Sequence, residues 1–196
     1  GKSRKEFRRL ERRLAEQGAL RYDAPQEACE SERSIQEFLA LEARGWKGRR
    51  GSAFDCTVSN RRFFTSIAAE AARRGRLMMI GLKVGDRPVA MKCNLLAGQG
   101  SFAFKIAYDE AYARFSPGVL LELENIRRFH ARPGLQWMDS CAESEHFMAN
   151  RLWPDRRSLV TTVATTGRAA GNFVVAALPL LRRLRRSLRP SLPAPA

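Results

Sequence analysis

Ser116, Pro117 and Gly118 have the types and the order that begin a helix. Serine is a preferred capping residue, and proline is favoured at the first helical position. The start of a helix offers unpaired backbone N–H groups and about half a positive charge, which suits a phosphate or pyrophosphate. Gly118 would let an anion approach the backbone closely, and Arg114 stands just upstream. The same pattern also fits an ordinary capped helix of the core whose glycine contacts no ligand, so the pattern alone does not identify an anion site.

Three apolar, strand-like stretches precede this helix and must position it. They span residues 76–84, 89–96 and 101–108, and the turn-forming segments 85–88 and 97–100 separate them. Tight turns can join only antiparallel neighbours, whereas parallel neighbours need a crossover. We therefore expect an antiparallel meander.

A helix and a further strand follow the meander. The helix runs from Ser116 to about Ala131 and leads to a strand at 135–139; such a crossover makes the two flanking strands parallel. We expect 159–163 to add a closing strand. The fold class is therefore α/β (α+β), a mixed sheet in which an antiparallel meander is followed by a βαβ unit. In such sheets the binding crevice lies at the carboxyl ends of the strands, here just after Tyr108.

Helical periodicity dominates the first 74 residues. The spacing of apolar residues predicts helices over 3–17, 26–44 and 60–74, a short strand at 20–22 and a loop over 45–59. The inward faces would consist of Phe7, Leu10 and Leu14, of Ile35, Phe38, Leu39 and Leu41, and of Phe63, Phe64, Ile67, Ala68 and Ala71. We expect helices on both faces of the sheet.

The charge of the chain is concentrated at its two ends. The 196 residues are 44% hydrophobic, which is ordinary for a globular domain, and the net charge is +15. Residues 1–21 contain eight basic and three acidic side chains, and residues 168–196 contain six arginines and no acidic one. The body between them is therefore not a basic nucleic-acid surface.

These observations predict three segments. Residues 1–24 form a basic helix and linker that continue from a preceding domain, 25–167 form the folded domain, and 168–196 form a basic amphipathic helix and a Pro-rich tail. The four cysteines lie far apart, without the spacing of metal ligands, so we expect no metal site. Scattered thiols in a chain with a sufficient core favour reduced packing residues and a cytoplasmic location.

The stretch from Tyr108 to Leu121 (YDEAYARFSPGVLL) resembles the YD-x-x-Y-x-x-x-SPG-x-x-L signature of GNAT-superfamily acyltransferases of the CelD-like kind. That group is found with cellulose and exopolysaccharide biosynthesis genes and is distantly similar to the Fem-type aminoacyltransferases of peptidoglycan assembly. Further pieces agree in order, namely Trp46 with 51–54, Arg76-Leu77, and 85–90. The resemblance covers roughly residues 30–158 and implies a GNAT-like fold.

The resemblance also implies a donor, acetyl-CoA or another acyl-CoA, lying across splayed strands. Its pyrophosphate would rest on the segment that enters the helix, which here comprises Tyr112, Arg114, Phe115, Ser116, Pro117, Gly118 and Val119. The usual phosphate loop, Q/R-x-x-G-x-G/A, is not matched, because Ser116 and Pro117 stand where glycines are expected. An acyl carrier protein and aminoacyl-tRNA therefore remain alternatives to acyl-CoA as the donor.

Acyl transfer to an amine needs a proton acceptor, donors for the oxyanion and an acid for the thiolate. The candidate bases are Asp139, Glu143, Glu145 and His146, and the candidate acids are Tyr108 and Tyr112. Each has a plainer interpretation, because Asp139 can cap a turn, a lone loop histidine often faces solvent, and tyrosines can be core residues. Cys141 is a weaker candidate nucleophile, since no histidine–carboxylate geometry can be inferred around it.

Trp46, Phe54 and Lys105 are candidates for contacts to the acceptor. For the two aromatic residues, buried packing is the alternative. The segment 173–189 combines an apolar stretch with clustered arginines, which fits an interfacial helix on anionic lipid or a solvated terminus. Lipid binding would place the protein peripherally at the inner membrane face.

Three functions remain open at this point. The first is an N-acyltransferase that acts on a small-molecule or saccharide amine, such as an amino sugar or an envelope polysaccharide precursor. The second is a Fem-like transferase that uses aminoacyl-tRNA. The third is a non-catalytic GNAT-like module that binds membrane or nucleic acid through its basic ends.

Overall fold

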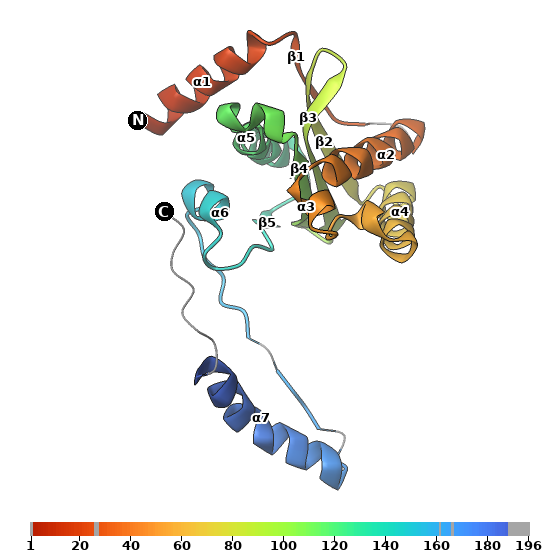
Figure 1. Cartoon of the computed structure of the whole chain (residues 1–196), viewed down its shortest axis with the longest axis vertical. Helices are drawn as coiled ribbons and strands as arrows, with labels where there is room; N and C mark the ends of the chain where they lie inside the picture. Colours follow the sequence, from red (N-terminus) through yellow and green to blue (C-terminus); the bar gives the residue numbers. More distant parts are fainter. Residues whose placement is uncertain (1, 26–27, 161, 166, 188–196) are drawn as a thin grey trace. The chain divides into compact units, whose positions relative to one another are not determined.

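The computed structural model describes residues 2–25, 28–160, 162–165 and 167–187. Contacts divide the chain into two units, residues 1–154 and residues 155–196. Figure 1 shows the first unit as a sheet between helices. In the second unit the described residues contain one helix, α7 (Ala169–Ser187). The predicted Pro-rich tail at 188–196 lies outside the described residues.

The first unit contains a five-stranded mixed sheet in the order β1-β2-β3-β4-β5. Its strands are β1 (Leu20–Asp23), β2 (Leu77–Val84), β3 (Arg87–Ala97), β4 (Gly100–Tyr108) and β5 (Trp137–Asp139). Neighbours from β1 to β4 are antiparallel, and β4 pairs with β5 in parallel. The predicted meander followed by a parallel pair is therefore confirmed.

Helices cover both faces of the sheet, as predicted, with a separate core on each. The first-unit helices are α1 (Lys2–Ala15), α2 (Ala28–Arg44), α3 (Trp46–Arg49), α4 (Val58–Arg73), α5 (Pro117–Ala131) and α6 (Phe147–Leu152), with short 3-10 helices η1 (Phe54–Cys56) and η2 (Glu110–Phe115). On one face α1 and α5 pack through residues such as Leu14 and Leu121. On the other face α2 and α4 pack through Phe38 and Phe64, whose rings stack at 5.0 Å.

The basic N-terminal helix α1 is part of the first unit. Leu10 and Leu14 are buried in the same core as Ile80 and Leu82 of β2, and Tyr22 of β1 donates a hydrogen bond to Glu11 of α1 at 2.9 Å. Contacts thus group α1 and β1 with the rest of the first unit, which ends at Pro154.

Some local predictions were wrong. The expected closing strand at 159–163 is not formed by the residues described there, and Leu159 and Val160 are 79% and 88% exposed, because no strand edge pairs with them. The predicted loop 45–59 contains α3, η1 and the start of α4. Phe63, expected inside, is 51% exposed, whereas its neighbour Phe64 is fully buried.

Candidate functional site

Strands β4 and β5 separate partway along β4. Their pairing begins at Gly100 and Trp137 and ends at Phe102 and Asp139, while β4 continues to Tyr108. Gly100 is required at the paired end, because a Cβ there would lie 2.4 Å from the Trp137 ring. The chain after β5 then turns away at Cys141, whose φ is 49° and whose N–H donates to Asp139 Oδ1 at 2.7 Å. The sheet is therefore open beside the second half of β4.

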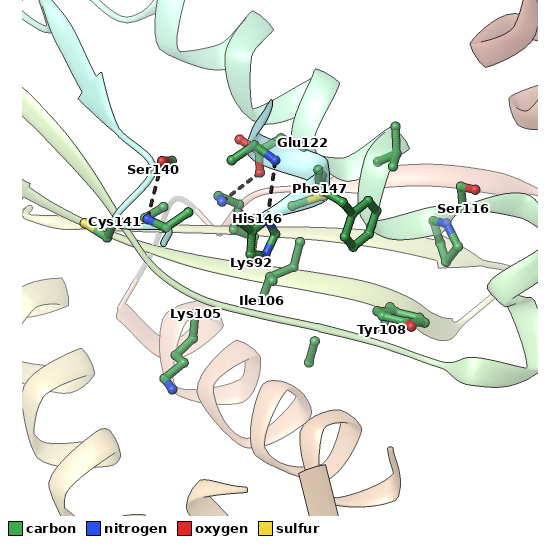
Figure 2. A pocket seen from close by; sticks show the side chains of 18 of the residues that line it. Lys92, Lys105, Ile106, Tyr108, Ser116, Glu122, Ser140, Cys141, His146 and Phe147 are labelled. Carbon is green, nitrogen blue, oxygen red and sulfur yellow. Dashed lines mark hydrogen bonds and ion pairs between the residues drawn. The ribbon is translucent and has the colours of Figure 1, made fainter. Parts of the chain in front are cut away.

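A cavity of about 480 Å³ occupies this opening. Its wall combines the free part of β4, the start of α5, the end of α2 with α3, and the segment that leads into α6. Figure 2 shows the side chains that converge there, among them Lys92, Tyr108, Ser116, Glu122 and His146. The predicted crevice after Tyr108 thus exists as a defined cavity.

The open edge of β4 presents backbone groups to the cavity. Asp109 N–H donates to the Val89 carbonyl at 2.8 Å, so the alternation of an antiparallel ladder turns the backbone groups of Ile106 and Tyr108 away from β3. Consistent with this, the Ile106 carbonyl accepts a hydrogen bond from Lys47 Nζ at 2.9 Å. The N–H groups of Ile106 and Tyr108 face the side on which β5 has left the sheet.

The start of α5 differs from its expected form. Ser116 precedes the helix in a left-handed conformation (φ 50°) and makes no side-chain capping bond. The N–H groups of Val119 and Leu120 both donate to the Ser116 carbonyl, at 3.0 and 3.2 Å. Pro117 has no N–H, so Gly118 supplies the amide at this helix start that is left for a ligand. The helix start therefore offers a ligand one backbone N–H group instead of the several that the sequence predicted.

Gly118 faces the cavity. A Cβ built on it would lie 3.8 Å from Ile106 Cδ1 and 3.9 Å from Tyr108 Cδ1, both ordinary contacts, so the fold itself tolerates a small side chain there. The start of α5 is therefore open to the cavity at Gly118, beside Tyr108.

The residues predicted for the donor segment divide into two groups. Ser116, Pro117, Gly118 and Val119 line the cavity, but Tyr112, Arg114 and Phe115 are not part of its wall. Phe115 is buried in the core, and the Arg114 guanidinium lies 4.7 Å from its ring centroid. Tyr112 packs against the same core.

The predicted catalytic residues divide in the same way. Tyr108 and His146 line the cavity, whereas Asp139, Glu143 and Glu145 do not. The Asp139 carboxylate accepts the Cys141 N–H, which matches the turn-capping alternative. Glu143 is exposed, and its carbonyl accepts the His146 N–H at 3.0 Å.

His146 has a defined role at the start of α6. Its Nδ1 accepts the N–H of Ala149 at 3.3 Å, and its ring stacks on Phe147 at 5.6 Å. A nitrogen that accepts a hydrogen bond carries no proton, so this contact assigns the proton of the neutral imidazole to Nε2. In this tautomer His146 is a hydrogen-bond donor rather than the base that the sequence suggested.

Two ion pairs in the cavity wall, one buried and one partly buried, could not be anticipated from the sequence motifs. Lys92 Nζ lies 2.7 Å from Glu122 Oε2, and Lys47 Nζ lies 2.8 Å from Glu42 Oε1. The sequence did contain one sign of such a pair: Lys92 stands within an apolar strand, where a charged side chain needs a partner of opposite charge. Both carboxylates in the wall are therefore already held by a lysine.

The expected acceptor residues lie on the α2 side of β4. Trp46 and Lys105 line the cavity, and Trp46 is 41% exposed. Phe54 stands behind them, where its ring stacks on Phe64 at 4.8 Å and lies 4.9 Å from Lys105 Nζ. Packing is thus the main role of Phe54.

Within the described part of the chain, no cluster of three or more His, Cys, Asp or Glu side chains could hold a metal ion. The helices described there include none that combines the length and apolar character needed to cross a bilayer.

Comparisons with known proteins agree with this geometry. The model of the acetyltransferase (GNAT) domain family matches residues 1–148. A similar solved structure is an aminoglycoside acetyltransferase, meta-AAC0020, from an uncultured soil metagenomic sample in complex with sisomicin (11% identity, TM-score 0.53, covering 74% of this chain and 95% of that one). Another is a ribosomal-protein-alanine N-acetyltransferase from Brucella melitensis biovar Abortus 2308 (11% identity, TM-score 0.50, covering 76% and 100%).

No curated protein sequence gives a significant match. At such low identities the solved structures establish the fold, a mixed α/β sheet of the GNAT type. The family model spans most of the chain, including both strands that border the cavity and the helix start beside them. The chain therefore belongs to the family of GNAT acetyltransferase domains.

Proposed function

We propose that this protein transfers an acyl group, most simply acetyl, from acyl-CoA to an amine of a saccharide such as an amino sugar or an envelope precursor. The observation that carries the proposal is the opening between β4 and β5 directly beside the start of α5. The saccharide acceptor is supported by the CelD-like motif over Tyr108–Leu121. The solved aminoglycoside acetyltransferase in complex with sisomicin has the same fold.

The residues around the cavity fit acetyl-CoA. The open edge of β4 offers the N–H groups of Ile106 and Tyr108, and an amide-bearing chain such as pantetheine can bind a free strand edge as a peptide does. The Gly118 amide and the positive end of the α5 dipole fit one phosphate oxygen. A volume of about 480 Å³ is within the range of small-molecule sites.

The side chains supply hydrogen-bond donors. Acetyl-CoA brings the acetyl group as a thioester, and its sulfur needs a proton when it leaves. His146 and Tyr108 line the cavity; we propose that the Tyr108 hydroxyl gives the sulfur this proton and regains one from water, while the Nε2–H of the neutral His146 ring only hydrogen-bonds to the sulfur. Both carboxylates of the wall are held by lysines, so we assign the proton of the amine to water. The pH profile of kcat/KM should then follow the ammonium pKa of the acceptor.

Helix α7 supports a peripheral membrane location on the cytoplasmic side. Phe173, Val174, Leu180 and Leu181 are 56% to 77% exposed on this helix, and the sequence places four arginines within 182–186. An amphipathic helix with this composition binds the surface of anionic membranes. Sedimentation with phosphatidylglycerol vesicles should retain the protein, and neutral phosphatidylcholine vesicles should not. Equal binding to both would contradict the proposal.

The donor assignment is tested by calorimetric titration with acetyl-CoA, free CoA and tRNA. Gly118→Asp should abolish CoA binding, because it places a carboxylate against the phosphate. Gly118→Ala is the matched control, since its methyl group makes only ordinary contacts and should leave the fold intact. Unchanged CoA affinity in Gly118→Asp would overturn the assignment. Binding of tRNA alone would favour the aminoacyl-tRNA-dependent alternative.

A further inference from the structure

We infer that the acceptor amine carries an anionic group, a carboxylate or a phosphate, that binds Lys105. The inference rests on the proposed function and specifies its substrate class. It starts from the charges of the cavity wall. Lys47 and Lys92 each lie within 2.8 Å of a glutamate, whereas Lys105 has no carboxylate partner among the residues that the structure describes. The wall therefore has one uncompensated positive charge.

Lys105 is held in place by aromatic packing. Its Nζ lies 4.9 Å from the centroid of Phe54, which itself stacks against Phe64 and contacts Phe104. The side chain is only partly exposed. A cation in this setting, beside a cavity, is suited to a ligand that supplies the missing negative charge.

The position of Lys105 assigns it to the acceptor rather than to the donor. It is paired with Cys93 and lies on the α2 side of the sheet, whereas Ile106 and Tyr108 pack against the core on the α5 side. Figure 2 shows Lys105 on the opposite side of the strand from Lys92 and Glu122. Gly118, the proposed phosphate contact, adjoins Ile106 and Tyr108 on that other side. The donor phosphates and Lys105 are thus on different faces of β4.

The same charge should disfavour polycationic acceptors. The proteins with this fold include an aminoglycoside acetyltransferase, whose bound compound sisomicin is a polyamine. In this chain the carboxylates of the wall, Glu42 and Glu122, are neutralised by their lysines, so a second ammonium group on the acceptor would meet no free anion there. An amino-sugar phosphate or an amino acid fits the wall better than an aminoglycoside.

The test uses matched acceptors and measures thiol release from acetyl-CoA. In the phosphate pair, glucosamine 6-phosphate is compared with glucosamine. In the carboxylate pair, an amino acid is compared with its amide. Neamine is the polycationic acceptor. We expect kcat/KM for at least one anionic member to exceed that of its neutral partner about tenfold or more. The phosphate and carboxylate arms distinguish the two sources of the anion. Equal rates within both pairs, or preference for neamine, would overturn the inference.

Variants of Lys105 complete the test. Lys105→Gln should remove the preference for the anionic acceptor without changing the affinity for acetyl-CoA. Lys105→Glu should reverse that preference. Lys5→Gln, on the exposed face of α1, is the control. A weaker affinity for acetyl-CoA in Lys105→Gln would assign Lys105 to the donor and overturn the inference. Thermal melting of each variant identifies any loss of folding.

The outcomes also separate this inference from the proposed function. Failure of acetyl-CoA to bind wild-type protein would refute the donor assignment. If CoA binds but no acceptor turns over, binding of the same acceptors to the CoA-loaded protein is measured by calorimetry. A Lys105-dependent preference for the anionic member then supports the inference, and its absence refutes the inference alone.

Discussion

Lys92 Nζ lies 2.7 Å from Glu122 Oε2, and the two side chains are only 5% and 1% exposed between β3 and α5. Glu122 Oε1 accepts a hydrogen bond from Asn125 Nδ2 at 2.9 Å, and Asn125 Oδ1 accepts one from Asn94 Nδ2 at 2.7 Å. This polar chain joins the central strand to the helix whose start borders the cavity. It therefore fixes the place of α5 beside the open edge of β4.

Neutralising one member of this pair should destabilise the fold more than neutralising both. Lys92→Met leaves a buried carboxylate alone, and Glu122→Gln leaves a buried ammonium alone; each should lower the free energy of unfolding by about 3–5 kcal/mol. The double variant keeps an acceptor for Asn125 and buries no charge. Urea unfolding should find it more stable than either single variant. Additive losses would show that the two charges do not depend on each other.

The sheet could be predicted from the sequence because its signals are local. Apolar stretches marked β2, β3 and β4, and Gly85 and Gly98, both at positive φ, marked the turns between them. The prediction of a strand at 159–163 was wrong, because the residues described there pair with no other strand, and pairing is not a local property. A predicted strand therefore forms only where another strand is in place to pair with it.

The candidate site was predicted in part. Sequence motifs identified Tyr108 and the segment Ser116–Val119, because the motif encodes a strand end followed by a helix start. They missed Lys92 and Glu122, which are far apart in the sequence and meet only through the register of β3 and the rotation of α5. Asp139 was a candidate base, but its carboxylate accepts a hydrogen bond from the turn that follows β5.

His146→Asn separates the two roles of this histidine. Asparagine is a favoured capping residue whose carbonyl oxygen can replace Nδ1 as acceptor for the Ala149 N–H, but it has no group in the place of Nε2–H. If Nε2–H donates to the departing sulfur, the variant should keep its melting temperature and lose about 10²-fold or more in kcat. Unchanged kcat would mean that His146 only caps α6.

Tyr22 should make the stability of the fold depend on pH in alkaline solution. Burial raises the pKa of its hydroxyl above the ordinary value of 10.0, and the hydrogen bond to Glu11 raises it further. A raised pKa means that the stabilisation is complete below pH 10 and is lost as the pH rises above it. Tyr22→Phe should lower the free energy of unfolding by about 1 kcal/mol at pH 8. The difference from wild type should shrink above pH 10, and a constant difference would contradict this assignment.

Cys141 provides a chemical footprint of the cavity. Burial raises the pKa of its thiol, and the neighbouring Asp139 carboxylate raises it further, so at pH 8 less thiolate is present than in a free thiol. Asp139→Asn keeps an acceptor for the Cys141 N–H but removes the charge, which should lower that pKa and speed alkylation by iodoacetamide. Peptide mass spectrometry measures both rates.

Because Cys141 lines the cavity, saturating CoA should slow its alkylation severalfold. Cys56 is exposed and is not part of the wall, so its rate should stay the same and serves as the internal reference. Cys93 should not react in the folded protein, since burial raises the pKa of its thiol to about 12. Equal slowing at Cys56 and Cys141 would indicate a change of the whole fold. No slowing at Cys141, at a CoA concentration that calorimetry shows to be saturating, would place the ligand outside the opening between β4 and β5.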